Sequence, residues 1–176
     1  MRIRATLSAF ALLGLVATTA QAQNPIEVGI DAQISFGLDD QGTSISIPAQ
    51  KVRAGFVINP AMTIEPSLGF FRTSDDAMSA STADIDVSLL YHFSTLRTAK
   101  QYYLRPVVGL RRVSFTDKTI DESASDSEMN IGVAGGVKIP LMDRVGARAE
   151  AEFRNYLSDP SVSAFNLNFG LSYYTR

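Results

Sequence analysis

The chain has 176 residues, with 16 basic and 18 acidic side chains and a formal net charge of −2 at pH 7. It contains no cysteine, which excludes disulfides and thiolate metal sites. Its single histidine argues against a histidine-rich metal site, and its acidic balance argues against a general nucleic-acid binder. We therefore expect no metal site, no cofactor and no nucleic-acid partner.

Residues 1–22 have the pattern of a secretory signal peptide. Two arginines are followed by an apolar stretch over residues 7–16 and by a small-x-small cleavage pattern at 20–22. The apolar stretch is too short for a spanning helix, and an uncleaved N-terminal helix is the alternative. Cleavage would remove two of the 16 basic residues and leave 14 against 18 acidic ones. The sequence predicts a signal peptide over 1–22 and one domain over 23–176.

Apolar and polar residues alternate along the rest of the chain, which is the pattern of β-strands with two different faces. Neither a helical period nor an apolar run long enough for a membrane helix follows the signal segment. The alternation occurs in eight segments: 26–38, 45–59, 64–71, 84–93, 102–111, 129–139, 145–156 and 165–174. Their lengths suit tilted membrane strands, which need ~9–11 residues.

The connections between these segments alternate in character. We predict tight turns at 59–62 and 140–143, a connection at 94–100, and loops at 39–44, 74–81, 116–127 and 157–161. Pro48 and Lys51 weaken the start of the second segment, which predicts a bulge or a projection beyond the membrane. Arg112 breaks the alternation of the fifth segment and predicts a bulge or the membrane rim. With eight strands, both chain ends, the two tight turns and the 94–100 connection would be periplasmic, and the other loops would be extracellular.

The segment 145–156 separates two faces most clearly. Its odd positions are apolar, and its even positions carry Arg148, Glu150, Glu152 and Arg154. An apolar face lies inside a soluble sheet but contacts lipid in a transmembrane barrel. Along the chain, glycines fall mostly on the polar face and bulky aromatic residues on the apolar face, which suits a narrow interior filled by side chains. We therefore predict an all-β, single antiparallel up-and-down transmembrane β-barrel of about eight strands, with a flattened soluble sandwich as the alternative.

The chain resembles small outer-membrane β-barrel proteins of the OmpA/OmpX type in its signal pattern, its alternating segments and its final F-N-L-N-F-G-L-S-Y-Y. The resemblance covers the whole mature chain and concerns patterns rather than fixed residues. It implies an outer-membrane location, contact with outer-membrane lipid and lipopolysaccharide, and recognition of the C-terminal strand by the barrel-assembly machinery. The family usually ends in an aromatic residue, whereas Thr175 and Arg176 follow Tyr174 here. The resemblance names no surface partner.

The polar faces would bring many charged side chains together inside such a barrel. Unpaired buried charges are costly, so we expect them to form a paired network that plugs the lumen. The residues expected in this network are Glu65, Arg105, Arg111, Lys138, Arg148, Glu150, Glu152 and Arg154. Further charges on the same faces are Glu27, Asp31, Arg53, Asp84 and Asp86. A gated, narrow ion path is the alternative.

The position of Lys138 next to the predicted turn at 140–143 allows a more specific expectation. It should face Gly146 or Arg148 on the next strand, with Glu150 within diagonal reach. The last segment offers only neutral partners, which are Asn166, Asn168 and Ser172. The residues expected to reach these charges from across the lumen are Glu65, Arg105 and Arg111.

His92-Phe93-Ser94 places a histidine and a serine two residues apart, on one face of a strand. Lipid A deacylase barrels carry a similar His-x-Ser pair, but Thr95 replaces the asparagine that follows it there, and no third catalytic residue is evident. We predict no catalytic residues and a non-enzymatic outer-membrane barrel with a structural, envelope-stabilising or surface-interaction role. The alternatives are a lipid A-modifying enzyme, a narrow gated ion channel and a soluble periplasmic barrel that binds an apolar ligand.

Overall fold

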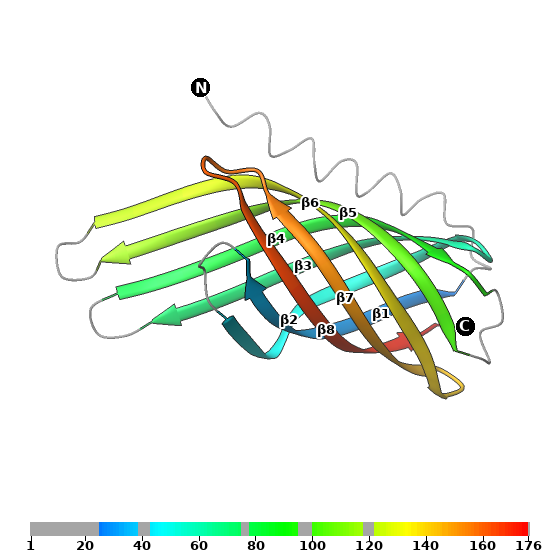
Figure 1. Cartoon of the computed structure of the whole chain (residues 1–176). Helices are drawn as coiled ribbons and strands as arrows, with labels where there is room; N and C mark the ends of the chain where they lie inside the picture. The colour runs from blue at the N-terminus through cyan, green and yellow to red at the C-terminus, as the bar shows by residue number, and fades with distance from the viewer. Residues whose placement is uncertain (1–24, 39–42, 75–77, 95–99, 118–121, 176) are drawn as a thin grey trace, which may run out of the picture.

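The structure is a computed structural model that describes residues 25–38, 43–74, 78–94, 100–117 and 122–175. The predicted signal peptide over 1–22 lies outside these residues. Within the described ranges, no helix is long and apolar enough to cross a membrane. The regular structure of this part of the chain consists of eight β-strands (Figure 1).

The eight strands form one closed antiparallel barrel, in which each strand pairs with the next and β8 pairs with β1. The strands are β1 Ile26–Gly37, β2 Thr43–Asn59, β3 Met62–Ser74, β4 Met78–His92, β5 Gln101–Asp117, β6 Glu122–Met142, β7 Val145–Tyr156 and β8 Val162–Tyr174. The predicted eight-stranded up-and-down architecture is confirmed. The segment predicted at 145–156 has the bounds of β7, because its alternation is unbroken from end to end.

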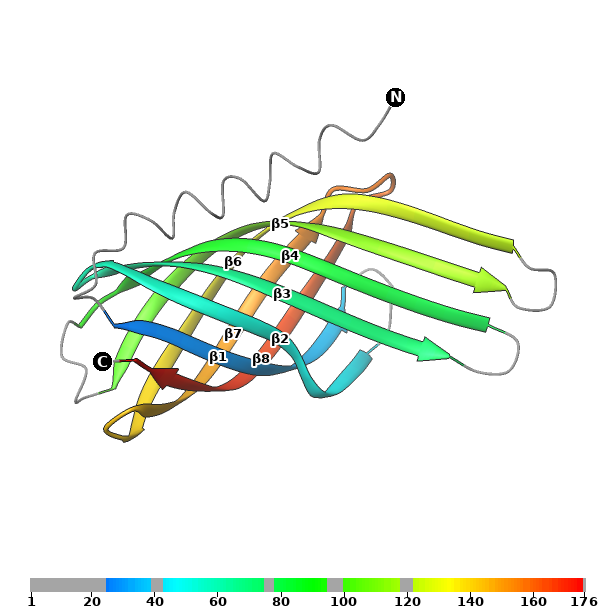
Figure 2. The ribbon, with the colours of Figure 1, turned by 180° about the vertical axis from the view of Figure 1, so that it is seen from behind.

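The two ends of the barrel differ, and we call them the terminal end and the distal end. At the terminal end the two ends of the described chain meet, and the Thr175 N–H donates to the Ile26 carbonyl oxygen at 2.9 Å. The β2–β3, β4–β5 and β6–β7 connections lie at this end, and the other connections lie at the distal end. Figures 1 and 2 show β3 to β6 reaching beyond the other four strands at the distal end.

This four-stranded distal extension comprises residues 70–74, 78–84, 111–117 and 122–128. It starts where pairing with the neighbouring strands stops, at Lys51 with Gly69 on one side and at Asn130 with Tyr156 on the other.

The predicted loops at 74–81 and 116–127 are wrong over most of their length. Strand β4 already begins at Met78, and β5 and β6 remain paired as far as Asp117 and Glu122. The serine- and aspartate-rich composition suggested loops, but cross-strand backbone hydrogen bonds form between polar residues as well as between apolar ones.

Two irregularities expected from the sequence have different outcomes. Between β1 and β2 the register changes from Asp31 opposite Lys51 to Gln33 opposite Ser46, which confirms the bulge predicted near Lys51. At Arg112 the pairing continues without a shift on both sides, so the alternative of a bulge there is wrong. The alternation of apolar and polar residues breaks at Arg112 because the types of side chain on the two faces change there. The register of β5 with β4 and β6 does not change.

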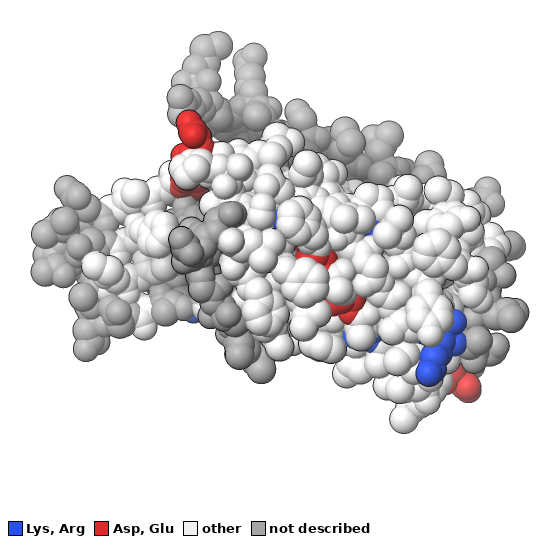
Figure 3. Space-filling model, viewed as in Figure 1, with Lys and Arg blue, Asp and Glu red and all other residues white. Residues whose placement is uncertain are grey.

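The barrel wall is apolar outside and polar inside, as the alternation predicted. Leu68 is 60% exposed on the outer face, whereas the lumen-facing residues Glu65 and Ser67 of the same strand are 1% and 7% exposed. The wall seen in Figure 3 is mostly uncharged, with only small charged areas among the other residues.

Gly135 and Gly136 allow a test of how crowded the lumen is, because these neighbours on β6 point to opposite faces. A Cβ atom on Gly136 would lie 2.8 Å from the Ala149 carbonyl oxygen and also against the Tyr103 phenol, whereas one on Gly135 would meet nothing within 4 Å. We expect Gly136→Ala to cost about 1–3 kcal/mol through overpacking, and Gly135→Ala to cost nothing or to stabilise slightly. Urea unfolding of the refolded barrel measures both, and equal effects would contradict a filled lumen.

Candidate functional site

Strand β7 supplies the centre of the charged interior. Its even positions Arg148, Glu150, Glu152 and Arg154 all point into the lumen and are buried, because side chains two residues apart on a strand share a face. Glu152 is fully buried, at 0% exposure. Four charges thus lie at successive levels of a water-poor interior, and each needs a partner there.

Of these four groups, Glu150 makes hydrogen bonds to the largest number of partner residues. One of its oxygens accepts from Arg105 Nε at 2.9 Å and from the Tyr103 hydroxyl at 2.8 Å. Arg105 and Arg148 each donate a further hydrogen bond at 2.5 Å, and Asn168 Nδ2 donates at 3.1 Å. The carboxylate is therefore held by two guanidiniums, one phenol and one amide.

Towards the distal end, the pairing continues through alternating signs. Glu152 accepts from Arg105 at 2.6 Å and from Arg154 at 2.8 Å. Arg154 also donates to Asp86 at 2.9 Å, and the Lys51 ammonium lies 2.8 Å from the same carboxylate. Each acid in this part of the lumen therefore has two basic partners.

Towards the terminal end, Glu65 accepts two hydrogen bonds from Arg148, both at 2.9 Å. Arg53 reaches the same carboxylate at 3.4 Å and also binds Glu27 at 2.6 Å. Arg53 Nε contacts Asp31 at 2.8 Å, and Lys138 pairs with Glu27. Ser172 on β8 bridges the group, because its hydroxyl accepts from Arg53 and donates to Glu27, both at 2.7 Å.

Together these contacts form one connected set, which we call the lumen network. Its basic members are Lys51, Arg53, Arg105, Lys138, Arg148 and Arg154, and its acidic members are Glu27, Asp31, Glu65, Asp86, Glu150 and Glu152. All twelve are buried, and the six positive and six negative charges balance. Strands β1 to β7 supply the charges, and β8 supplies the neutral donors Asn166, Asn168 and Ser172.

Seven of the eight residues singled out from the sequence belong to the lumen network, and Arg111 does not. Arg111 donates to Asp84 at 2.8 Å and its guanidinium stacks 3.8 Å from the centre of the Tyr156 ring. It pairs with Asp84 because the two are direct neighbours across β4 and β5. Both lie distal to the lumen network, at the start of the extension.

The expectation for Lys138 is correct in register and wrong in partner. Lys138 lies opposite Arg148 in the β6–β7 pairing, as predicted. Its ammonium pairs with Glu27 on β1, however, and not with Glu150. The guanidiniums of Arg105 and Arg148 already occupy Glu150, and Glu27 is the acid that faces the terminal end.

Two members of this interior were missed at the sequence level. Lys51 was interpreted only as a residue that weakens a strand. It lies two residues from Arg53 on the same strand, however, and therefore faces the lumen as Arg53 does. Tyr103 shares its parity with Arg105, and its hydroxyl accepts from Arg148 at 2.6 Å while donating to Glu150. The alternation along each strand places both residues on the lumen face, but it gave no reason to select a tyrosine as a member of a charged network.

The sequence pair His92 and Ser94 lies at the terminal end of β4. The His92 ring is buried in the lumen, 6.0 Å from the centre of the Tyr103 ring, and its backbone N–H donates to the Ala61 carbonyl oxygen at 2.8 Å. A histidine on the lumen face points away from the lipid around the barrel, so it does not face the acyl chains that a lipid deacylase must reach.

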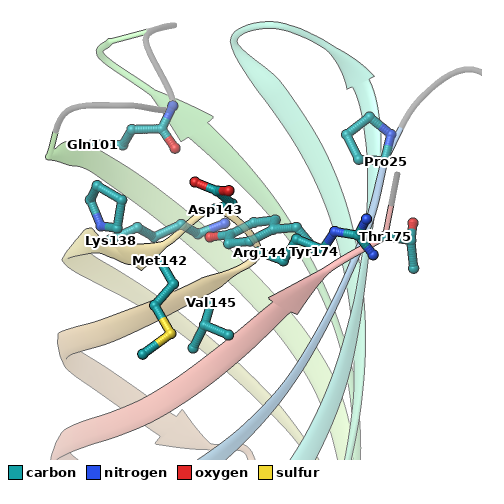
Figure 4. A pocket seen from close by; sticks show the side chains of 10 residues that line it. Pro25, Gln101, Lys138, Met142, Asp143, Arg144, Val145, Tyr174 and Thr175 are labelled. Atoms are coloured by element: carbon teal, nitrogen blue, oxygen red, sulfur yellow. The ribbon is translucent and has the colours of Figure 1, made fainter.

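A cavity of about 440 Å³ opens at the terminal end, next to the last ion pair of the lumen network (Figure 4). Its lining includes Gln101, Lys138, Met142, Arg144 and Tyr174. Among the residues that the structure describes, no group of three or more His, Cys, Asp or Glu side chains could hold a metal ion. The cavity leads towards Lys138, whose ammonium is paired with Glu27.

Comparison with known proteins adds to this geometry. The outer membrane protein beta-barrel domain family matches residues 8–173. Neisserial surface protein A (NspA) is 17% identical, with a TM-score of 0.66 over 84% of this chain and 96% of that chain. Ail, the attachment invasion locus protein of Yersinia pestis, is 13% identical, with a TM-score of 0.59 over 86% and 97%. OprG from Pseudomonas aeruginosa is 11% identical, with a TM-score of 0.54 over 87% and 96%.

At these identities, the likeness to solved structures concerns the fold. No curated protein sequence matches the chain. The family match extends over nearly the whole chain, and the closed eight-stranded barrel with an apolar outer wall agrees with it. The chain belongs to the outer membrane protein beta-barrel domain family and is a transmembrane β-barrel protein of the outer membrane.

Proposed function

We propose that the protein is a non-enzymatic, non-conducting outer-membrane barrel with a structural role in the envelope, and that the lumen network plugs it. The observation that carries this proposal is the continuity of the network, whose ion pairs join twelve buried residues from seven strands. An eight-stranded barrel has an interior just wide enough for side chains to fill. A solute could pass only if it displaced paired side chains.

The charge balance supports a plug rather than an ion path. With six charges of each sign, the network has no excess charge that would attract one kind of ion. Breaking one buried pair leaves an uncompensated charge and typically costs about 3–5 kcal/mol. Such a barrier at each level of the lumen opposes the passage of ions.

Conductance tests the plug directly. In planar bilayers, the purified protein is expected to give no stepwise conductance, because a network that plugs the lumen would leave no continuous water-filled path. Arg111→Gln, which lies outside the network, should behave like the wild type. Removing the pair Arg105 and Glu150 together, as alanines, keeps the charge balance and opens space, so conductance should rise. Regular ion-selective steps from the wild type would contradict the plug and support the narrow channel.

The non-enzymatic part of the proposal rests on the placement of His92. Its ring lies in the lumen, beside Tyr103 and within the plugged interior. Lipid A substrates would reach the outer wall, which carries apolar side chains. Mass spectrometry of lipid A from cells that overexpress the protein tests this, since a new deacylated species would contradict it.

The family match also supports a proposal about export and assembly. We propose that residues 1–22 act as a cleaved signal peptide and that the C-terminal strand β8 is recognised by the barrel-assembly machinery. Strand β8 supports this by its alternating outer residues, which are Phe165, Leu167, Phe169, Leu171 and Tyr173. Once assembled, this face would contact outer-membrane lipid and lipopolysaccharide. N-terminal sequencing of the protein from outer-membrane fractions would locate the cleavage site, and a start other than residue 23 would contradict it.

A further inference from the structure

The distal extension reverses the polarity of the barrel wall. Within the barrel the outer face is apolar and the lumen face is charged, up to a row formed by Asp84, Arg111 and Glu128 on neighbouring strands. Beyond this row the outer face carries the exposed Phe70 and otherwise mainly polar side chains, which are Arg72, Ser81, Arg112, Ser114, Ser125 and Ser127. The lumen-side face carries apolar ones, which are Phe71, Met78, Val113 and Phe115.

The reversal is a property of the side chains, because the pairing of the four strands continues without a shift through this region. Phe115 therefore has the same parity as the lumen residue Arg105, and Phe71 has the same parity as Glu65. The polar outer face suits a wall that has left the lipid. The apolar lumen-side face is the unusual one, since no membrane lies on that side of the extension.

These apolar residues lie on one face of the extension, which we call the distal apolar face and define as Phe71, Met78, Phe115 and the half-buried Val113. Phe71 is 44%, Phe115 58% and Met78 61% exposed. Across the strands, Phe71 lies opposite Thr82, which lies opposite Val113, and Phe115 lies between Ala80 and Ala124. Contiguous exposed apolar patches with a polar border commonly mark interaction sites.

The border of the patch is acidic. Asp84 and Glu128 flank the single base Arg111 in the row below the patch, and Asp126 lies opposite Val113 on β6. Among the lumen-side side chains that the structure describes in the extension, the three acids Asp84, Asp126 and Glu128 accompany the one base Arg111, whereas Arg72 and Arg112 are on the other face.

We propose that the distal apolar face docks a partner protein through a segment that combines basic and apolar side chains. The apolar side chains of that segment would cover Phe71 and Phe115, and its basic side chains would pair with Asp126 and Glu128. A second copy of the same face would bring like charges together. Phosphorylated lipid headgroups would be repelled for the same reason. This inference concerns the outside of the barrel and does not depend on the plugged lumen.

The chain has no tryptophan, so binding can be followed by the fluorescence of a tryptophan placed in a probe peptide. The protein is reconstituted in phosphatidylcholine nanodiscs, and empty discs serve as the background. One probe is a peptide of alternating lysine and leucine with a single tryptophan, and the second replaces every lysine with glutamate. We expect the lysine peptide to bind the loaded discs more tightly than empty ones, and the glutamate peptide not to distinguish them.

Variants then assign the binding to the face. The double change Phe71→Ser and Phe115→Ser should weaken the lysine peptide about tenfold or more, as loss of central apolar contacts does. The matched control, Ser81→Ala and Ser114→Ala, alters the same sheet on its outer face and should leave affinity unchanged. Heat-modifiable migration on gels checks that both variants are folded. Equal binding of the two peptides, equal binding to empty discs, or full affinity of the phenylalanine variant would each overturn the proposal.

Discussion

Replacing Glu150 with alanine is expected to lower the free energy of unfolding by about 3–5 kcal/mol, the cost typical of breaking a buried ion pair. The carboxylate accepts from Arg105, Arg148, Tyr103 and Asn168, and its removal leaves two guanidiniums side by side without their shared acid. Neither guanidinium can turn to water, since both are buried. Urea unfolding of the barrel refolded into lipid vesicles measures the loss.

Two control variants make this test specific. Glu128→Ala removes a part-exposed acid from the distal extension and should change stability by no more than about 0.5 kcal/mol. Glu150→Gln keeps the volume and removes the charge, which separates electrostatics from the loss of packing.

A double-mutant cycle with Arg105→Ala should give a coupling energy of about 0.5–3 kcal/mol, because Arg105 has lost one of its two acidic partners once Glu150 is removed. If the coupling energies of Glu150 with Arg105 and with Arg148 were both zero, the charges would be separately hydrated. The lumen would then be wetter than a plug, and the narrow ion path would become the better explanation.

The sequence predicts well those features that depend only on alternation. In β7 the apolar and charged positions alternate over the whole strand, and the structure keeps both its bounds and its faces. The same reasoning predicts that Lys138 lies opposite Arg148, because a tight turn fixes the register of the two strands that it joins. Local geometry is sufficient for these predictions.

Contacts across the lumen were less accessible to sequence reasoning. Lys138 and Glu27 lie on β6 and β1, which are not neighbours in the barrel, and they meet only because the closed barrel brings their levels together. Strand tilt and stagger decide which levels meet, and no single segment of sequence reports them. Of the residues expected to reach β7 from across the lumen, Glu65 and Arg105 do so, whereas Arg111 does not. The pairing of Lys138 with Glu27 was not predicted.

The strands of the distal extension were predicted as loops for a different reason. Its residues on β6, Ser123 to Glu128, contain no large apolar side chain, so they resemble a loop by composition. In the structure they continue the backbone pairing of β5. Alternation marks strands whose two faces meet lipid and lumen, and beyond the lipid that contrast is lost or reversed.

Replacing Leu167 with arginine is expected to cost about 2–4 kcal/mol, the penalty for a charge on the lipid face near the bilayer midplane. Leu167 lies in the middle of β8, between Ile34 and Ala151 on the neighbouring strands, so every adjacent outer side chain is apolar. No acid lies within its own row to offset the charge.

Depth provides the control for this experiment. Arginine at Tyr173, near the terminal end of the same face, should cost only about 0–1 kcal/mol, because the penalty falls towards the membrane interface. Arginine at Leu171 should lie between the two values. Arginine at Asn168, which faces the lumen, is not a suitable control, because the Asn168 side chain is buried and donates a hydrogen bond to Glu150. Urea unfolding in vesicles gives the three values, and a flat profile from Leu167 to Tyr173 would mean that this face of β8 does not cross the lipid.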